Sequence, residues 1–378
     1  MHATSLQAPA PKLNKGFRVL ELAGGVVPQG ALVKVARFVW GTLWRIMMAE
    51  LAPQDPTGAY VRPSYDFKGV IGSPQFPAEP GRYHVYLGQA CPWCHRVSLT
   101  LALRSLNNGG ITFSYMCDDP ERASRGGWSF TEEQPDPVFG CGDLREVYQR
   151  CSPGYEGRCT APLIVDSKGG PDGQGAIVSN ESKDIVRMLN AAHGLGGNSI
   201  DLCPPDLEQQ VEETNEWVYR LINNGVYRAG FATLQAGHDK ACADVETGLD
   251  RAEQILQERR FLNGDRLTES DVFLFPTAVR FDAVYAVLFS FNQTDVCRFA
   301  FCFCMHRWMK EVYALPGVPA TIDLVDIRRS YYQQLFPLNP GAIIPTGPSI
   351  EDLMESGSPS HSGSKPKLES VFYEQSRV

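Results

Sequence analysis

The chain has 378 residues, and at about 150 residues per domain this length predicts two domains with additional segments. Hydrophobic residues make up 43% of the chain and charged residues 21%, which excludes a disordered or fibrous protein. The formal net charge of −8 argues against nucleic acid as a partner, because phosphate binding requires a basic surface.

Cysteine usage and the N-terminus bear on the compartment. Eleven unevenly spaced cysteines indicate free thiols in a reducing compartment and not a disulfide scaffold. The first twenty residues lack the apolar core of a secretory signal, and Lys12, Lys15 and Arg18 precede the first acid, Glu21. We therefore expect a cytoplasmic protein, with a plastid or another organelle as the alternative.

The first predicted element is a helix over residues 31–49. Lys34, Arg37 and Arg45 interrupt its apolar run, which makes an integral membrane span a poor interpretation. At about 100° per residue the three cations share one side of the helix. Two interpretations remain open: the helix packs on the protein body, or it lies on a membrane surface.

Four segments follow from the pattern of the whole chain. Residues 1–80 form an extension that carries this helix, residues 81–200 mix short strands with helices, and residues 201–344 are helical. Residues 345–378 contain a Ser-, Gly- and Pro-rich stretch that cannot bury a core, which predicts a disordered tail.

The chemistry begins after a predicted strand at 82–87. Cys91-Pro-Trp-Cys94 stands there, directly before a helical pattern over 97–106. A cysteine at this junction faces the unpaired N–H groups of the first helical turn, which favour the thiolate. The spacing predicts a thioredoxin-like redox motif. A zinc site is disfavoured because no second cysteine pair follows, so we expect no metal.

Two further segments are candidates for ligand binding. Pro162, near the start of an apolar run over 160–166, fits a cis turn that leaves the backbone of Ala161 free for a ligand. Glu181 and Ser182 stand at the start of a predicted helix, where N–H groups can hold the charged ends of an amino acid. Ordinary helix capping is the alternative interpretation of these two residues.

The predicted helical half contains a capping-box pattern at Thr268-Glu-Ser-Asp271. It also contains Tyr227, Tyr285 and Tyr331. A tyrosine is by default an amphipathic packing residue, so the pattern alone assigns none of the three to catalysis.

Several motifs in order resemble those of the glutathionyl-hydroquinone reductases, the xi class of the glutathione transferase superfamily. The motifs are Cys91–Arg96, Gly127–Phe130, Tyr155–Pro162, Val178–Ser182, Asn223–Ala232, Leu267–Asp271 and Arg280–Tyr285. The resemblance covers residues 60–348 and leaves out the N-terminal helix and the C-terminal tail.

The resemblance implies an α/β thioredoxin-like N-terminal domain, an all-α C-terminal domain and a homodimer. It implies a reductase that cleaves glutathionyl-hydroquinones through a Cys91–glutathione mixed disulfide, with glutathione as co-substrate and no metal. In that family pattern Cys91 is the nucleophile, Tyr227 gives and takes the proton, and Tyr285 and Tyr331 help to lower the pKa of the cysteine. The implied glutathione-binding residues are Trp128, Arg158, Cys159, Thr160, Ala161, Glu181 and Ser182.

Two positions depart from the family pattern: Ala161 replaces a usual valine, and Cys94 replaces a common alanine. Cys94 is either a buried small hydrophobe or a thiol that resolves the mixed disulfide. The second interpretation leads to an alternative function, a glutaredoxin-like thiol transferase or dehydroascorbate reductase that uses Cys91 and Cys94. A non-catalytic binding module of the same fold is disfavoured by Cys91 and the three tyrosines.

Overall fold

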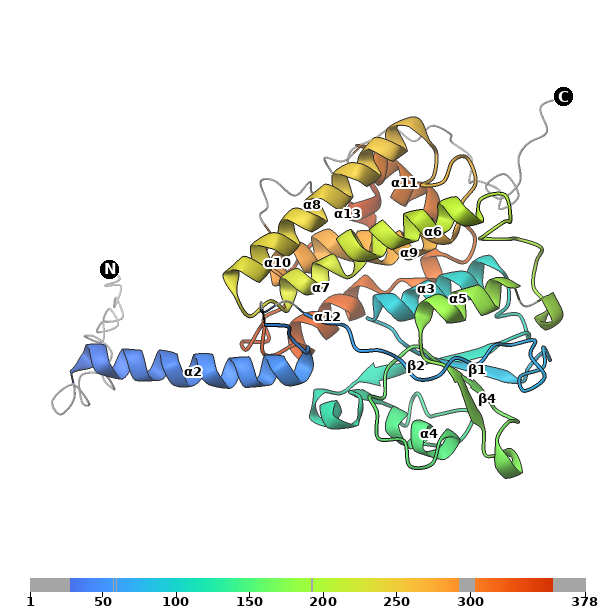
Figure 1. The fold of residues 1–378 in the computed structure, drawn as a ribbon, viewed down its shortest axis with the longest axis horizontal. Helices are drawn as coiled ribbons and strands as arrows, with labels where there is room; N and C mark the ends of the chain where they lie inside the picture. Colours follow the sequence, from blue (N-terminus) through green and yellow to red (C-terminus); the bar gives the residue numbers. More distant parts are fainter. Residues whose placement is uncertain (1–27, 57, 59, 192, 292–302, 356–378) are drawn as a thin grey trace, which may run out of the picture. The chain divides into compact units, whose positions relative to one another are not determined.

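The computed structural model describes residues 28–56, 58, 60–191, 193–291 and 303–355 (Figure 1). The chain divides into two compact units, residues 1–51 and 52–378. The described part of the first unit is the helix α2 (Gln29–Leu51), which confirms the helix predicted over 31–49. In the described part of the chain no helix combines the length and the apolar character that crossing a membrane requires.

The second unit is built on one five-stranded sheet of order β3-β2-β1-β4-β5. Its strands are β1 (Tyr83–Gly88), β2 (Thr112–Asp118), β3 (Trp128–Ser129), β4 (Leu163–Asp166) and β5 (Ala176–Ser179). The β1–β2 pair is parallel, and the other three pairs are antiparallel. All six residues of β1 are buried, as expected of a central strand that is covered on both faces.

Helices cover the sheet in layers. α3 (Pro92–Leu103) and α5 (Ser182–Ala191) pack against each other between the sheet and the helical half, whereas α4 (Leu144–Cys151) lies on the opposite face (Figure 1). Among the described residues, short 3₁₀ segments follow these elements at Pro120–Arg125, Pro171–Gly173 and His193–Leu195, and a fourth, Pro319–Thr321, lies in the helical half.

The C-terminal half is helical, as predicted. Its helices are α6 (Glu208–Trp217), α7 (Gly225–Gly230), α8 (Gln235–Glu258), α9 (Glu269–Arg280), α10 (Ala286–Leu288), α11 (Phe303–Tyr313), α12 (Leu324–Gln334) and α13 (Ile350–Glu355). Two π turns interrupt them, η4 (Val218–Asn223) and η5 (Phe281–Tyr285). The capping box is present, because the Thr268 N–H donates to the Asp271 carboxylate over 2.9 Å.

Buried polar contacts join the two halves of this unit. Arg96 on α3 donates to the Asn223 amide oxygen over 2.6 Å, and Asn223 in turn donates to the carbonyl oxygen of Phe273. Arg280 at the end of α9 donates to the carbonyl oxygen of Ala90 over 3.0 Å. A buried cation is costly unless it is paired, so these contacts fix the helical half against the loop before Cys91.

The structure differs from the predicted disordered tail over residues 345–355. The Ser349 hydroxyl caps α13, and the buried Leu353 offers its carbonyl oxygen to His306 over 2.7 Å. Such long-range contacts have no signature in local composition. Residues 356–378, with the Ser- and Gly-rich stretch, lie outside the described residues.

The segment before the first strand also packs on the sheet. Gly69 donates its N–H to the carbonyl oxygen of Val178 over 2.8 Å, and Lys68 forms a bridge with Ser179 of β5. Residues 52–80 therefore belong to the same compact unit as the rest of the sheet. The domain boundaries drawn from the sequence stay a prediction.

Candidate active site

Cys91 lies between β1 and α3, as the sequence predicted. It immediately precedes Pro92, the first residue of α3, and its backbone is extended with φ −73° and ψ 121°. Its carbonyl oxygen accepts the N–H of His95 over 3.0 Å. The residue is partly exposed, and its sulfur lies at the positive end of the helix.

The surroundings of Cys91 favour its thiolate. A hydrogen bond from the Cys94 thiol, the backbone N–H groups of Cys94 and Trp93, and the charge of Arg280 lower the pKa of Cys91 to about 7, against the opposing effect of burial. At neutral pH a large fraction of this cysteine is therefore ionised, which makes it a nucleophile.

Cys94 has a role that neither sequence interpretation contained. It is buried, and its sulfur accepts the N–H of Gly88 over 3.2 Å. Burial raises the pKa of Cys94 well above its usual range, so Cys94 keeps its proton and donates it in a hydrogen bond to Cys91. The structure confirms the predicted burial of Cys94, while its use as a resolving thiol stays a prediction.

The rate at which iodoacetamide alkylates Cys91 should depend on the fraction of the Cys91 thiol that is ionised. Because its pKa lies at about 7, the rate should rise through neutral pH and level off in alkaline solution, as the thiolate replaces the thiol. In Cys94→Ala the midpoint should move to higher pH, with a severalfold slower reaction at pH 7. Mass spectrometry of the Cys91 peptide measures the rate. Cys242→Ala, at a half-buried cysteine on α8, is the matched control, and an unmoved midpoint in Cys94→Ala contradicts the hydrogen bond.

Arg280 holds the loop before Cys91 from the helical side. It is fully buried and donates to the carbonyl oxygen of Ala90 and to Nδ1 of His95, the latter over 2.9 Å. Since an arginine can only donate, Nδ1 of His95 is an acceptor and Nε2 donates to Thr321 over 2.9 Å. Burial and the Arg280 charge lower the pKa of His95 well below its usual range. The buried cation near Cys91 is thus Arg280, to which the sequence pattern assigned no role.

The second predicted loop lies beside Cys91. The Ala161–Pro162 peptide is cis, as predicted, and the Ala161 carbonyl oxygen lies 3.9 Å from the Cys91 sulfur. The Thr160 carbonyl oxygen accepts a hydrogen bond from Tyr148. Arg158 and Thr160 are exposed, whereas Cys159 is buried. The backbone of this segment is therefore held close to the reactive sulfur.

Trp128, at the edge strand β3, packs on the loop that leads to Cys91. A Cβ atom on Gly88 would lie 2.2 Å from the Trp128 ring. Only glycine fits at position 88, so the tryptophan and the end of β1 are in direct contact. This brings one more of the predicted glutathione-binding residues to the Cys91 loop.

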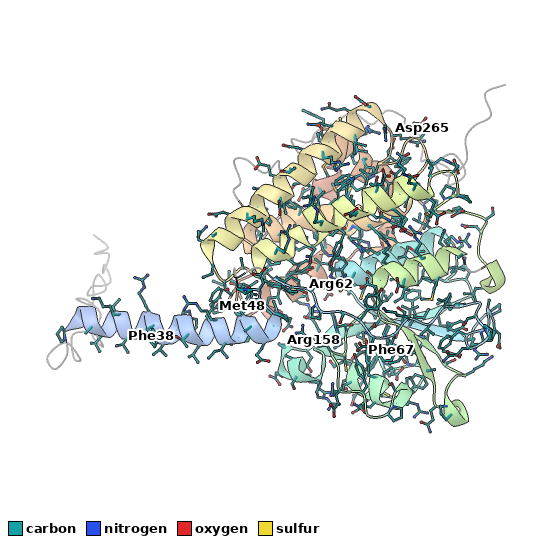
Figure 2. All side chains as sticks on the ribbon, in the orientation of Figure 1. Phe38, Met48, Arg62, Phe67, Arg158 and Asp265 are labelled. Carbon is teal, nitrogen blue, oxygen red and sulfur yellow. The ribbon has the colours of Figure 1, made fainter. Side chains whose placement is uncertain are left out.

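Glu181 and Ser182 form the start of α5. Glu181 accepts hydrogen bonds from the Ser182 hydroxyl and the Lys183 N–H, each over 3.2 Å, which is the capping arrangement considered from the sequence. Its other oxygen pairs with Arg62 over 2.9 Å. Arg62 (Figure 2) also lies 4.5 Å above the centre of the Trp93 ring. Sequence reasoning missed Arg62, because this residue lies in the segment predicted as an extension.

The three tyrosines converge from separate helices. The Tyr227 hydroxyl lies 2.5 Å from that of Tyr331 and 3.4 Å from that of Tyr285, and the last two are 3.2 Å apart. Burial raises the pKa of all three, and the charge of Cys91 adds to the rise for Tyr227 and Tyr285. The cluster is therefore neutral at physiological pH and holds protons close to Cys91.

Aromatic rings surround these hydroxyl groups. The Trp93 ring stacks on Tyr227 with 6.1 Å between ring centres, and Phe231 and Phe289 contact Tyr227 from other sides. The π turn η4 ends four residues before Tyr227, and η5 ends at Tyr285. Turns of this type are rare and concentrate at functional sites. The result is an apolar surface with polar hydroxyls, suited to an aromatic substrate.

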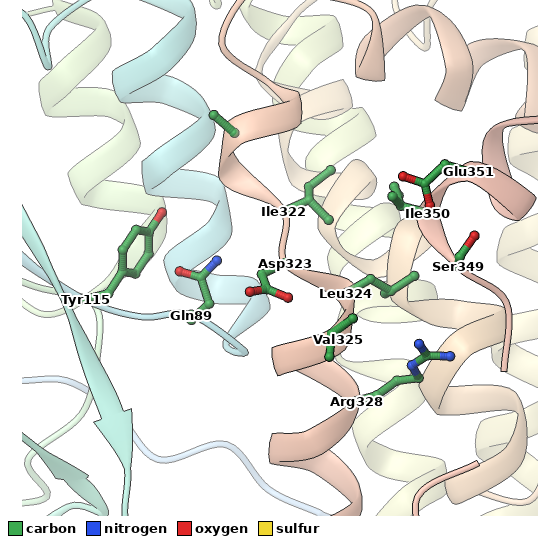
Figure 3. A pocket seen from close by; sticks show the side chains of 11 residues that line it. Gln89, Tyr115, Ile322, Asp323, Leu324, Val325, Arg328, Ser349, Ile350 and Glu351 are labelled. Carbon is green, nitrogen blue, oxygen red and sulfur yellow. The ribbon is translucent and has the colours of Figure 1, made fainter. Parts of the chain in front are cut away.

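A separate pocket of about 510 Å³ lies between the end of β1, β2, α12 and the start of α13 (Figure 3). Its polar lining comes from Gln89, Tyr115, Asp323, Arg328, Ser349 and Glu351. Cys91 and the three tyrosines are not among the residues that line it, so the chemistry belongs elsewhere. Among the residues that the structure describes, no group of three or more His, Cys, Asp or Glu side chains is arranged to hold a metal ion.

Two protein-family models match the chain. The glutathione S-transferase N-terminal domain matches residues 90–192, and the glutathione S-transferase C-terminal domain matches residues 235–313. These matches confirm the predicted combination of a thioredoxin-like domain with an all-α domain.

Curated relatives are similar over most of the chain. Glutathionyl-hydroquinone reductase YqjG of Escherichia coli (strain K12) is 38% identical over 285 residues, which span 74% of this chain and 83% of that protein. Glutathionyl-hydroquinone reductase PcpF of Sphingobium chlorophenolicum is 36% identical over 299 residues, which span 77% of this chain and 90% of that protein.

Solved structures show the same likeness. The glutathione-S-transferase Xi from Phanerochaete chrysosporium superposes with a TM-score of 0.70 at 31% identity, covering 81% of this chain and 97% of that one. The glutathione-bound structure of YqjG from Escherichia coli K-12 superposes with a TM-score of 0.69 at 35% identity, covering 79% of this chain and 97% of that one.

Proposed function

The chain belongs to the glutathionyl-hydroquinone reductases, the xi class of the glutathione transferases, and from this membership we propose that it reduces glutathionyl-hydroquinones to hydroquinones at Cys91. One observation carries the proposal. A cysteine whose pKa is lowered to about 7 lies close to a cluster of neutral tyrosine hydroxyls inside an aromatic surface. This arrangement supplies a nucleophile, a proton donor and an apolar surface to which an aromatic ring can bind.

In the first step the Cys91 thiolate attacks the sulfur of the glutathionyl-hydroquinone. A sulfur–sulfur bond forms, the bond between sulfur and the ring carbon breaks, and the electron pair stays on the ring carbon. Tyr227 delivers a proton to that carbon, and the products are the hydroquinone and a Cys91–glutathione mixed disulfide. Tyr285 and Tyr331 hold the Tyr227 hydroxyl in place, and in the family pattern they would also help to lower the pKa of Cys91.

In the second step Tyr227 takes a proton back from the thiol of free glutathione, and the resulting thiolate attacks the glutathione sulfur of the mixed disulfide. Glutathione disulfide leaves and the Cys91 thiolate is restored. The two glutathione sulfurs are oxidised together, and the quinol carbon is reduced. No metal enters either step, and Cys94 is not consumed in this cycle.

We further propose where glutathione binds. The backbone of Ala161 faces Cys91 and would pair with the peptide backbone of glutathione beside its sulfur. Glu181 and Ser182 at the start of α5 would hold the amino-acid end of glutathione, with Arg62 next to them. The remaining contacts are assigned to Trp128, Arg158, Cys159 and Thr160.

The alternative function is a thiol transferase or dehydroascorbate reductase that uses Cys91 with Cys94. The buried position of Cys94 and its bond with the Gly88 N–H favour the single-cysteine cycle. Three substrates should separate the two functions: a glutathionyl-hydroquinone, a glutathionylated peptide and dehydroascorbate. We expect kcat/KM to be at least about tenfold higher for the first, because Tyr227 supplies the proton that its ring carbon needs and the surrounding aromatic rings bind the quinol. Equal or higher values for the other two would replace our proposal with the alternative.

The oligomeric state and the compartment are proposed from the family membership and from the sequence. We propose a homodimer, as the family membership implies, which light scattering of the purified protein measures. For the compartment we propose the cytoplasm, with an organelle such as the plastid as the alternative. The uneven set of cysteines agrees with either reducing environment.

A further inference from the structure

The helix α2 carries an apolar face that the active site does not use. Apart from Phe38, six large apolar side chains of α2 are each at least 44% exposed. They are Val33, Val35, Val39, Trp40, Leu43 and Ile46, and we call them the α2 face. Exposed apolar groups are ordinary when scattered, but six on one helix form a contiguous patch that water does not favour.

The cations of α2 lie on the other side of the helix. At about 100° per residue, Lys34, Arg37 and Arg45 fall within one quarter of the circumference, whereas the α2 face spans about half of it. Phe38, which Figure 2 labels on α2, is 73% exposed, and the same spacing places it at the edge of the cationic side. Glu50, the single acid of the helix, lies near its C-terminal end and by the same spacing falls on the side of the α2 face. The positive charge of α2 contrasts with the formal net charge of −8 of the whole chain.

The width of the α2 face and the three cations distinguish among three environments that could cover the helix: a second copy of the chain, the interior of a bilayer and the surface of a membrane. A helix–helix seam with a second copy uses a narrow apolar stripe, and the α2 face is wider than that. A span through the bilayer is excluded by the three cations, and α2 lacks the apolar character to cross a membrane. A broad apolar face with a tryptophan, opposite a row of cations, is typical of a helix that lies in a membrane interface.

We propose that α2 is a membrane-surface helix that binds anionic bilayers. The α2 face enters the boundary between headgroups and acyl chains, and Lys34, Arg37 and Arg45 lie at the level of the lipid phosphates. The binding thereby holds the rest of the chain at the lipid surface. This inference does not rest on the reductase activity, and each one can fail without the other.

The test uses the purified full chain and sedimentation with vesicles. The vesicles are phosphatidylcholine alone, or phosphatidylcholine with about one third phosphatidylglycerol. We expect binding to the anionic vesicles that weakens with salt, and weaker binding to the neutral ones. The variant Leu43→Glu with Ile46→Glu should reduce binding at least about tenfold, because two charges would enter the apolar boundary. Reversal of the cations, Lys34→Glu with Arg37→Glu and Arg45→Glu, should remove the preference for anionic vesicles.

The matched control is Ile343→Glu with Val325→Glu, which places the same two charges at side chains that are 76% and 71% exposed outside α2. It should bind vesicles as the unchanged protein does. Circular dichroism and turnover of a water-soluble glutathionyl-hydroquinone should stay the same in every variant. The inference is overturned if the unchanged protein stays in the supernatant, or if the double variant sediments equally well. It is also overturned if the double variant changes the oligomeric state instead, since the α2 face would then join two copies.

Discussion

Cys91→Ser should reduce turnover of a glutathionyl-hydroquinone to below about 1% of the original rate, because a hydroxyl is not ionised at neutral pH and attacks sulfur poorly. The groups that lower the pKa of Cys91, namely the Cys94 thiol, the N–H groups of α3 and Arg280, act on a thiol and cannot make the serine oxygen a comparable nucleophile. The measurement is steady-state release of hydroquinone, with circular dichroism to establish that the variant is folded.

A second readout separates this outcome from a general loss of binding. Incubation with the substrate in the absence of free glutathione should add one glutathione to Cys91 in the unchanged protein and none in Cys91→Ser, as read by mass spectrometry. Cys242→Ser, the same substitution at a half-buried cysteine on α8, should behave like the unchanged protein. A folded Cys91→Ser variant that keeps more than a few per cent of the rate would show that another group attacks the sulfur.

Tyr227→Phe should lower turnover of a glutathionyl-hydroquinone by roughly 10²-fold, in the range of a lost general acid. Phenylalanine keeps the ring that stacks on Trp93 and removes only the hydroxyl that bonds with Tyr331 and Tyr285. Without that hydroxyl, the ring carbon must take its proton from water as the bond to sulfur breaks.

A second substrate distinguishes the loss of a proton donor from a structural defect of the site. With a small disulfide as substrate the leaving group is a thiolate that needs no proton on carbon, so Tyr227→Phe should react within about threefold of the unchanged protein. Tyr332→Phe, at the next tyrosine of α12, removes a hydroxyl that bonds with the Val284 carbonyl oxygen and should affect neither substrate. Equal losses on both substrates would assign Tyr227 to packing.

The sequence was sufficient where a local pattern determines local structure. The strand, the cysteine and the helix around Cys91 follow one another along the chain, so the junction and its effect on the thiol could be predicted. The same holds for the capping box at Thr268, the cis peptide before Pro162 and the helix over 31–49. Each of these depends on neighbours a few residues apart, whose geometry the backbone itself restricts.

Only the tertiary structure decided which of these elements meet. Arg62 reaches Glu181 across 119 positions, and the Tyr227 hydroxyl meets that of Tyr331 across 104. Trp128 packs on Gly88, and Leu353 bonds with His306 in a segment whose composition predicted disorder. The cluster of hydroxyls and the buried Arg280 therefore had no signature in the spacing of the chain. Contacts of this kind arise when whole helices pack against the sheet, and the burial that packing creates is what raises the pKa of the tyrosines and of Cys94.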